Sequence, residues 1–409
     1  MQSDEKFMMD KIQKELLDEL EYMGDLSDEK IEELIAEKLL KESKEVYIPL
    51  ELRIRLGKKL YYAMRRLDIL QELLDDESIT EIMVNGTDHI FIEKAGRIEK
   101  LDRKFESKEK LENIIQQIVA KCNRVVNDSS PIVDARLLDG SRVNVVLNPV
   151  ALNGPILTIR RFPKEAVSME KLISIGSVTK EAAELLEKLV IAGYNIIISG
   201  GTGSGKTTFL NALSGFVNKE ERIITIEDSA ELQLQGIDNL VRMETKNANT
   251  QSCKPITIRD LIKTSLRMRP TRIIVGEVRG GEAMDMICSA MNCGHDGSMS
   301  TIHANSAQDA LARLEIMILM AVEMPITAIR NQVGNGVDII IQLGRMRDKS
   351  RKVLEITEIL QYSQGEILTK PLYIFQEETG NETEKLQGKL VKVGELEHVQ
   401  KLKAAGIRI

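Results

Sequence analysis

The segment GGTGSGKTT at residues 200–208 places glycines around a lysine that two threonines follow. This G-x-x-x-x-G-K-T spacing lets the backbone curl so that successive N–H groups point at phosphate oxygens. We expect Lys206 to reach the β- and γ-phosphates and Thr207 to hold Mg²⁺. The predicted nucleotide-binding positions are Gly200, Gly201, Thr202, Gly203, Ser204, Gly205, Lys206, Thr207 and Thr208. The chemistry predicted from this segment is binding of a nucleoside triphosphate.

Two further segments place carboxylates directly after short apolar runs. Glu227 and Asp228 follow residues 223–226, and Glu277 follows residues 273–275. An α/β sheet binds its ligands at the carboxyl ends of its strands, where a carboxylate can orient an attacking water or take its proton. We therefore predict that Glu277 and Glu227 are catalytic, and that Thr207, Glu227 and Asp228 hold Mg²⁺, partly through water. An exposed acidic turn is the alternative for Glu227 and Asp228. Arg279 is predicted to bind the nucleotide, and it could instead hold the loop by pairing with Glu277.

The segment GHDGSMSTIHANS carries His295 and His303 shortly after Cys288 and Cys293, a set of residue types that could ligate zinc. If residues 282–293 are helical, the two cysteines point about 140° apart. We therefore expect both cysteines in the core and no zinc site. His295 lies among turn residues. His303 follows a short strand and is the third predicted catalytic residue, in contact with the γ-phosphate or Glu277. A satisfied core histidine is the alternative, and Thr301 faces the same side of that strand.

The elements that must position these residues follow from the pattern of apolar residues. A helix at 179–192 and a strand at 195–199 open an alternation that ends near Leu343 and predicts a parallel sheet with helices on both faces. Residues 76–161 combine short strands with a helix near 109–122 and predict a smaller α+β domain. Residues 162–172 are predicted to be a linker, and residues 173–409 an α/β nucleotide domain that closes in an appended, polar hairpin region at 344–409, with its tip near GNE.

Residues 1–75 predict a helical module that offers no chemistry of its own. Ser27 is placed as an N-cap before a helix with apolar positions at Ile31, Leu34, Ile35 and Leu39, and a second stripe follows at Leu52, Leu56, Leu60 and Met64. Residues 1–45 hold 7 lysines against 15 aspartates and glutamates, a charge of −8, while the whole chain carries −7. Docking to a partner, or a place at the periphery of an oligomer, is favoured over a solvated pair of charged helices.

Composition narrows the class of protein. The chain lacks tryptophan, and outside residues 1–45 its charge is nearly balanced, so we expect no direct contact with nucleic acid. The acidic N-terminus is unlike a secretion signal, and four cysteines fit a reducing cytoplasm. The apolar run at residues 316–322 is much shorter than the roughly 20 residues that span a bilayer. We expect a cytoplasmic protein that contacts the membrane only through partners.

Four motifs in this order resemble the ATPases of type II and type IV secretion and of type IV pili. GGTGSGKTT is similar to their Walker A loop, TIEDSAEL to their Asp box, RIIVGEVRGGEA to their Walker B motif and GHDGSMSTIHANSAQDALARLE to their His box. The segments ITEIMVNGTDHIFIEKAGRI, DARLLDGSRVN, LTIRRF and RMRDKSRKVLEITEIL, with the acidic N-terminal extension, resemble the tight-adherence pilus branch (CpaF-like). The tetracysteine zinc element of some type II relatives is absent from the sequence.

The resemblance implies a RecA-like P-loop NTPase fold behind a smaller α+β domain. It also implies a homohexameric, Mg²⁺-dependent ATPase that drives pilin or substrate export through an inner-membrane platform protein, at the cytoplasmic face of that membrane. Arginines that sense the nucleotide would be Arg142, Arg160 or Arg161, and Arg267; ordinary surface charge is the alternative for each. Three other functions stay open: a sister ATPase that exports protein or DNA, a RecA-like helicase stimulated by nucleic acid, and a nucleotide-gated scaffold.

Overall fold

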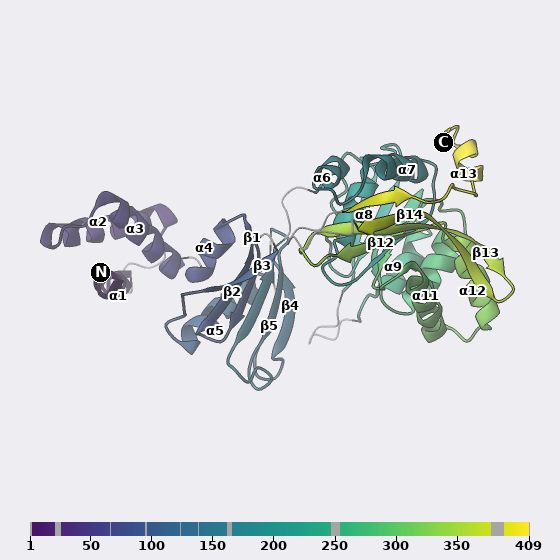
Figure 1. The fold of residues 1–409 in the computed structure, drawn as a ribbon. Coiled ribbons are helices and arrows are strands. Elements are labelled where there is room, and N and C mark those ends of the chain that lie inside the picture. Colours follow the sequence, from purple (N-terminus) through teal and green to yellow (C-terminus); the bar gives the residue numbers. More distant parts are fainter. Residues whose placement is uncertain are drawn as a thin grey trace. The chain divides into compact units, whose positions relative to one another are not determined.

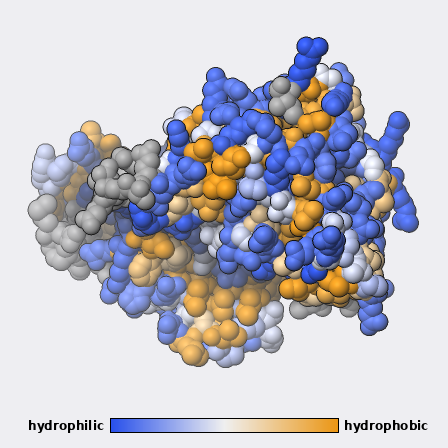
Figure 2. Space-filling model, turned by 45° about the vertical axis from the view of Figure 1, so that its right-hand side comes forward, coloured by the Kyte–Doolittle hydropathy of each residue, from blue (hydrophilic) through white to orange (hydrophobic). Residues whose placement is uncertain are grey.

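The computed structural model describes residues 2–20, 26–65, 67–94, 96–122, 124–137, 139–161, 166–246, 254–377 and 388–408. The chain divides into two compact units, Met1–Pro163 and Lys164–Ile409. The predicted linker at 162–172 lies partly outside the described residues, and its last part enters a short helix, α6 (Met169–Ser174). Among the helices of the described ranges, none is long and apolar enough to cross a membrane. The face drawn in Figure 2 is largely hydrophilic, and hydrophobic residues gather on it in several patches.

The first unit begins with the predicted helical module. Its helices are α1 (Gln2–Leu20), α2 (Asp28–Glu45), α3 (Leu50–Arg65) and α4 (Ile69–Asp75) (Figure 1). The predicted cap is confirmed, because the Ser27 hydroxyl accepts a hydrogen bond from the backbone N–H of Lys30 at 3.4 Å. The predicted apolar stripes form one core that includes Ile31, Ile35, Leu39, Leu56 and Leu60, together with Ile12 and Leu16 of α1.

A six-stranded sheet follows, whose strands are all antiparallel to their neighbours. Its strands are β1 (Ile79–Asn85), β2 (His89–Lys94), β3 (Arg97–Leu101), β4 (Ile132–Arg136), β5 (Arg142–Val146) and β6 (Ile156–Arg160), in the order β3-β2-β1-β6-β5-β4. The predicted helix near 109–122 is α5 (Lys108–Lys121), which buries Leu111, Ile115 and Ile118 in the core it shares with this sheet. This unit has the α+β composition that the sequence predicts.

The second unit contains a nine-stranded sheet in the order β15-β14-β13-β12-β7-β11-β10-β8-β9. Its parallel part runs through β12 (Ile339–Arg345), β7 (Ile196–Gly200), β11 (Met299–Ile302), β10 (Arg272–Val278), β8 (Ile223–Glu227) and β9 (Leu240–Glu244). All of these strands point their carboxyl ends to one edge. We refer to this edge as the carboxyl edge, and the predicted site lies along it.

Helices cover both faces of the parallel strands, as the alternation predicts (Figure 1). Ile196 and Ile198 of β7 pack with α6, α7 (Lys180–Ile191) and α8 (Lys206–Ser214). Ile197, between them, faces the other layer, which contains α9 (Ile258–Ser265), α10 (Glu282–Met284), α11 (Ala307–Ala321) and α12 (Ile326–Gly336). The expected fold class is confirmed: a parallel-rich α/β domain follows a smaller α+β domain.

The C-terminal region differs from the expected appended hairpin region. β13 (Arg351–Ser363), β14 (Glu366–Glu377) and β15 (Gly388–Lys392) continue the central sheet beyond β12 as antiparallel strands, and α13 (Gln400–Ala404) follows them. Tyr373 and Leu390 of these strands lie in the same core as β7. The polar pattern hid this role because only one face of these strands is buried. The expected tip at 380–382 lies outside the described residues.

Candidate active site

The glycine-rich loop joins β7 to α8 as the strand, loop and helix order predicts. A Cβ atom on Gly200 would lie 2.5 Å from the Ser204 hydroxyl oxygen and 2.7 Å from the Leu343 carbonyl oxygen, so only glycine fits there. Gly203 and Gly205 have φ values of 71° and 93°, in the left-handed region that glycine favours. The loop therefore has the tight curvature that turns backbone N–H groups inward.

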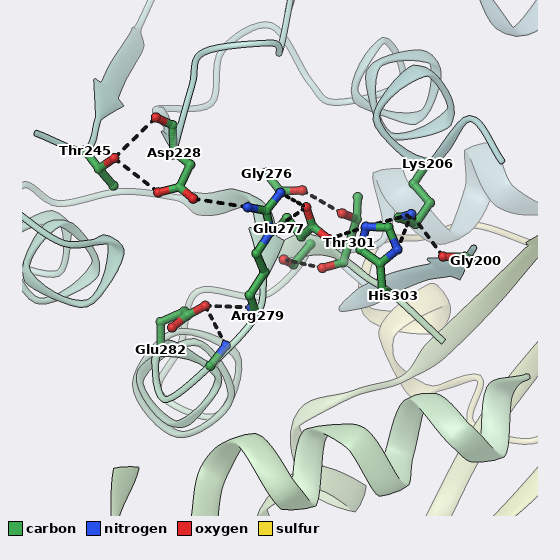
Figure 3. Close-up of polar contacts among 12 residues, drawn as sticks. Gly200, Lys206, Asp228, Thr245, Gly276, Glu277, Arg279, Glu282, Thr301 and His303 are labelled. Atoms are coloured by element: carbon green, nitrogen blue, oxygen red, sulfur yellow. Dashed lines mark hydrogen bonds and ion pairs between the residues drawn. The ribbon is translucent and has the colours of Figure 1, made fainter. Parts of the chain in front are cut away.

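Lys206 extends its side chain back over this loop. Its Nζ atom donates to the carbonyl oxygens of Gly200 and Gly201, each at 3.0 Å, and lies 3.4 Å from Nδ1 of His303 (Figure 3). Thr207 and Thr208 occupy the first turn of α8 and are half-buried. The loop thus brings an ammonium group and the positive end of a helix to one place at the carboxyl edge.

Glu277 and His303 meet between β10 and β11. Nε2 of His303 lies 2.8 Å from Oε1 of Glu277, and both side chains are mostly buried. Burial lowers the pKa of His303, an effect that the neighbouring Glu277 carboxylate opposes. The lowered pKa favours the neutral ring at pH 7, whose unprotonated nitrogen can accept from Lys206. The contact with Glu277 is a close approach rather than a hydrogen bond, because Oε1 of Glu277 has no hydrogen-bond partner within the described residues.

Thr301 fixes the spacing of the same two strands. Its hydroxyl donates to the carbonyl oxygen of Gly276 at 2.8 Å, one residue before Glu277. Thr301 and His303 are two residues apart, and β11 ends at Ile302. The sequence indicated a common side for these two residues, and the contact with Gly276 shows what Thr301 does there.

Arg279 holds the other side of Glu277. Its Nη2 and Nε atoms donate to Oε2 of Glu277 at 2.7 and 3.0 Å, and its Nη1 atom lies 3.5 Å from Oδ2 of Asp228. The backbone N–H of Arg279 donates to Oε1 of Glu282 at 2.6 Å. The alternative in which Arg279 pairs with Glu277 matches this geometry.

Glu227 and Asp228 lie in different environments although they are adjacent. Asp228 is half exposed, and its Oδ1 atom accepts from the Thr245 hydroxyl at 3.1 Å. Glu227 is only 3% exposed, and its Oε1 atom accepts from the backbone N–H groups of Glu231 and Leu232 at 2.7 and 2.9 Å. The exposed-turn alternative therefore does not describe Glu227, which also shapes the loop after β8.

The environment of the second carboxylate oxygen of Glu227 changes the pKa of this residue. Oε2 is buried and has no hydrogen-bond partner within the described residues. Burial raises the pKa of Glu227 to about 7, against the two backbone hydrogen bonds that lower it. A Cβ atom on Gly276 would lie 3.0 Å from Cγ of Glu227, so the glycine makes room for this side chain. A carboxyl group with this pKa can exchange a proton near neutral pH.

We predict that Glu227→Gln changes how stability depends on pH. Below pH 4.5 the glutamate carries a proton in both the folded and the unfolded chain. As pH rises from 4.5 to about 7 the unfolded chain releases its proton first, so the free energy of unfolding of the wild type falls by about 3 kcal/mol. The glutamine variant lacks this loss. Urea unfolding at several pH values measures the free energy of unfolding of both proteins. If this free energy depended on pH in the same way in both, the raised pKa of Glu227 would be contradicted.

The histidine and cysteine segment only partly matches the prediction. Nδ1 of His295 lies 3.1 Å from the Pro270 carbonyl oxygen, as a turn residue would. Asp285–Met291 is a π-helix, so the α-helical angle between the cysteines does not apply. Cys288 packs against the core, whereas Cys293 is exposed and donates to the Cys288 carbonyl oxygen at 3.0 Å. Placing Cys293 in the core was therefore wrong.

The four arginines expected as sensors are divided between the two units of the chain. Arg142 and Arg160 are cross-strand neighbours in the first unit, and Arg161 donates to the Asp76 carbonyl oxygen of that unit. Arg267 is exposed after α9, next to Met268, whose carbonyl oxygen accepts from Arg222 just before β8. Arg267 thus lies at the amino edge of its own sheet, opposite the glycine-rich loop.

One residue at the loop was missed by the sequence reasoning. Nε of Arg351 donates to the carbonyl oxygen of Gly203 at 3.0 Å, and a Cβ atom on Gly205 would lie 3.3 Å from Cδ of Arg351. The signal in the sequence was the basic segment RMRDKSRKV, in which Arg345 and Arg351 are paired across the β12–β13 hairpin. The sequence gives no sign that this hairpin reaches the loop.

The oxygen atoms at this edge suit a magnesium ion that arrives with a nucleotide. In the described ranges no group of three or more histidine, cysteine, aspartate or glutamate side chains could hold a metal. Mg²⁺ bound with phosphates needs only one or two carboxylates beside hydroxyl and water oxygens. Oε2 of Glu227, which has no hydrogen-bond partner within the described residues, is a carboxylate oxygen that could ligate the ion, and Thr207 and Asp228 supply further oxygens.

Comparison with known proteins places the chain among secretion components. The type II/IV secretion system protein family matches residues 64–391. A putative conjugal transfer protein of Mycobacterium tuberculosis is 31% identical over 305 residues, which are 73% of this chain and 86% of the relative. The type IV secretion system protein PtlH of Bordetella pertussis is 31% identical over 316 residues, 71% of this chain and 93% of that protein.

Two solved structures share the fold. The pilus retraction motor PilT with bound ADP has a TM-score of 0.52 at 18% identity and covers 80% of this chain and 83% of its own. The ATPase DotB of Legionella pneumophila has a TM-score of 0.50 at 18% identity and covers 72% of this chain and 80% of its own. At this identity the likeness concerns the fold alone.

Proposed function

Because the chain belongs to the type II/IV secretion system protein family, we propose that it is the ATP-hydrolysing motor of a pilus assembly or secretion system. The observation that carries this proposal is the continuous set of contacts from the glycine-rich loop through Lys206 and His303 to Glu277 (Figure 3). Phosphoryl transfer to water uses a lysine that binds phosphate and a carboxylate that orients the water, and here the imidazole of His303 contacts both.

The proposed roles follow from these contacts. The loop N–H groups and Lys206 bind the phosphates, and Glu277 orients the attacking water and takes its proton. Mg²⁺ supplies charge neutralisation at the phosphates when bound, and Thr207, Asp228 and Glu227 are the residues that would hold it, partly through water. His303 contacts both Lys206 and Glu277, so it can report at Glu277 whether the lysine is engaged by phosphate.

A ring would complete the site with residues from another copy. We propose a homohexamer in which Arg142, Arg160 or Arg161 and Arg267 sense the nucleotide of a neighbouring subunit. Arg142 and Arg160 are register partners in β5 and β6, so their side chains leave the same face of the sheet. This supports the role, because guanidinium groups suit phosphate oxygens. Rocking of residues 76–161 against residues 173–409 about the linker at 162–172 would convert hydrolysis into work.

The cellular role that fits best is export through an inner-membrane platform protein, from the cytoplasmic face of that membrane. The motifs shared with the tight-adherence branch favour pilus assembly. A sister role, export of protein or DNA, is the second candidate, because relatives are named as conjugal transfer and type IV secretion system proteins. No direct contact with nucleic acid is proposed in either role.

The purified full-length chain tests the biochemical part of the proposal. We expect steady-state ATP hydrolysis that EDTA abolishes, a solution mass of six copies in ATP, and no stimulation by single-stranded DNA. Binding without turnover would instead support a nucleotide-gated scaffold, and stimulation by DNA would support a helicase. Counting surface pili and scoring DNA and protein transfer in a strain that lacks the chain separates the two export roles.

A further inference from the structure

An apolar groove of about 930 Å³ lies between α2 and α3 in the helical module. Buried side chains of both helices form its floor, among them Ile35 and Leu39, and α4 contributes at one end. Along its sides, Leu40, Leu50 and Ile54 are 49%, 61% and 64% exposed. Exposed apolar side chains that gather around a depression mark an interaction site rather than chance exposure.

Gly57 of α3 leaves space above the apolar floor of the groove, because it has no side chain. A Cβ atom at this position would already lie 3.4 Å from Cδ1 of Leu39 and 3.9 Å from Cγ2 of Ile35. Glycine inside a helix costs about 1 kcal/mol relative to alanine, yet α3 carries it where it faces two side chains of α2. The glycine keeps this part of α3 free of side-chain atoms, so the depression stays open.

The two walls of the groove carry opposite charge. Glu32 and Glu37 line it from α2, whereas Arg53 and Lys58 line it from α3. Asp75 of α4 lines the same groove and interacts electrostatically with Lys58. Within the described part of the chain, neither Glu32, Glu37 nor Arg53 forms an ion pair. Lys58 lies over the Tyr62 ring, 5.2 Å from its centroid. The groove therefore favours an occupant with cations along the edge that faces α2 and anions along the edge that faces α3.

We propose that this groove binds an amphipathic helix of a partner protein, with Leu or Ile along its apolar face, Lys or Arg on one edge and Asp or Glu on the other. The lining of α3 extends from Leu50 to Tyr62, about 18 Å, which three turns of a helix fill. A helix bound in such a groove places its apolar side chains at positions i, i+3, i+4 and i+7 against the floor.

Other occupants fit the same surface less well. A concave groove cannot be filled by the identical groove of a second copy, since a convex element is needed. Helix α1 of the same chain already buries Ile12 and Leu16 in the core of the helical module. The mixed charge of the walls distinguishes the proposed helix from a purely basic segment that the acidic N-terminus would attract without specificity.

Three designed 14-residue helical peptides test the proposal on the full-length protein. All share one leucine face; the first carries lysines on one edge and glutamates on the other, the second lysines on both edges and the third glutamates on both. Fluorescence anisotropy at 150 mM salt should give the mixed peptide at least about tenfold tighter binding than either uniform peptide. Helix direction is free in this assay, so reversed binding does not disturb the comparison.

A matched pair of variants locates the binding. Ile54→Glu should weaken the mixed peptide at least about tenfold, because it places a charge on the apolar wall. Ile98→Glu, on β3 outside the groove and 65% exposed, should leave binding unchanged. Circular dichroism should show that both variants fold, and both should hydrolyse ATP at the wild-type rate, so a failed motor hypothesis is separable from a failed docking hypothesis.

Three results would overturn the proposal. The first is tighter binding of the all-lysine peptide, which would mean general attraction to the acidic module. The second is no binding of the mixed peptide, or binding that Ile54→Glu does not weaken. The third is a change in the solution mass of the protein on Ile54→Glu, which would make a second copy the occupant of the groove.

Discussion

Glu277→Gln should lower the rate of ATP hydrolysis by about 10²- to 10³-fold while ATP still binds. The amide cannot take a proton from the attacking water, yet it keeps an oxygen that Arg279 can donate to, in place of the 2.7 and 3.0 Å contacts. Removing one negative charge beside the phosphate site cannot weaken binding of an anion electrostatically. Single-turnover hydrolysis and titration with a fluorescent ATP analogue measure the two effects separately.

A matched control is Glu315→Gln in the same unit. Glu315 is a glutamate whose two oxygens accept from Arg330 at 3.0 and 3.2 Å, away from the loop. This variant should hydrolyse ATP at the wild-type rate.

His303→Ala should keep nucleotide affinity and lose the coupling between binding and assembly. Normal turnover in Glu277→Gln would remove Glu277 from the proposed mechanism, and unchanged assembly in His303→Ala would remove the sensor role.

The parts of the site that the sequence predicts are those with a local cause. The glycine-rich loop needs only a strand before it and a helix after it, and Glu277 and His303 meet because β10 and β11 are parallel neighbours. Each of these features follows from a short segment and one rule of sheet topology. The elements around them were predictable for the same reason.

The parts that the sequence missed have distant causes. Arg351 reaches Gly203 across 148 residues of chain, through a hairpin whose polar pattern suggested an appendage. Arg267 lies at the amino edge because α9 must return there before β10 begins. The exposure of Cys293 follows from a π-helix, which an apolar pattern does not distinguish from an α-helix. Glu227 and Asp228 are adjacent, and only tertiary burial separates their chemistry.

Lys206→Ala should weaken ATP binding by about 10²-fold, because a hydrogen bond from a charged donor to phosphate contributes about 1.5–3 kcal/mol and an ammonium makes more than one. The same change should also lower the free energy of unfolding by about 1 kcal/mol, since two loop carbonyl groups lose the donor that lies 3.0 Å from each. Thermal unfolding with and without ATP separates the two effects.

The ligand-induced shift in stability is what decides the role of Lys206. At an ATP concentration about 100 times its wild-type Kd, binding adds about 2.7 kcal/mol to the wild type, and nearly all of this should vanish in the variant. Lys370→Ala removes another lysine of the same unit, paired with Glu397 at 2.7 Å away from the loop, and should keep the full shift. A variant that loses basal stability but keeps the ATP-dependent shift would show that Lys206 only braces the loop. Loss of the shift with little loss of basal stability would instead mean that the contacts to Gly200 and Gly201 yield readily to phosphate, as a motor that rebinds ATP in every cycle requires.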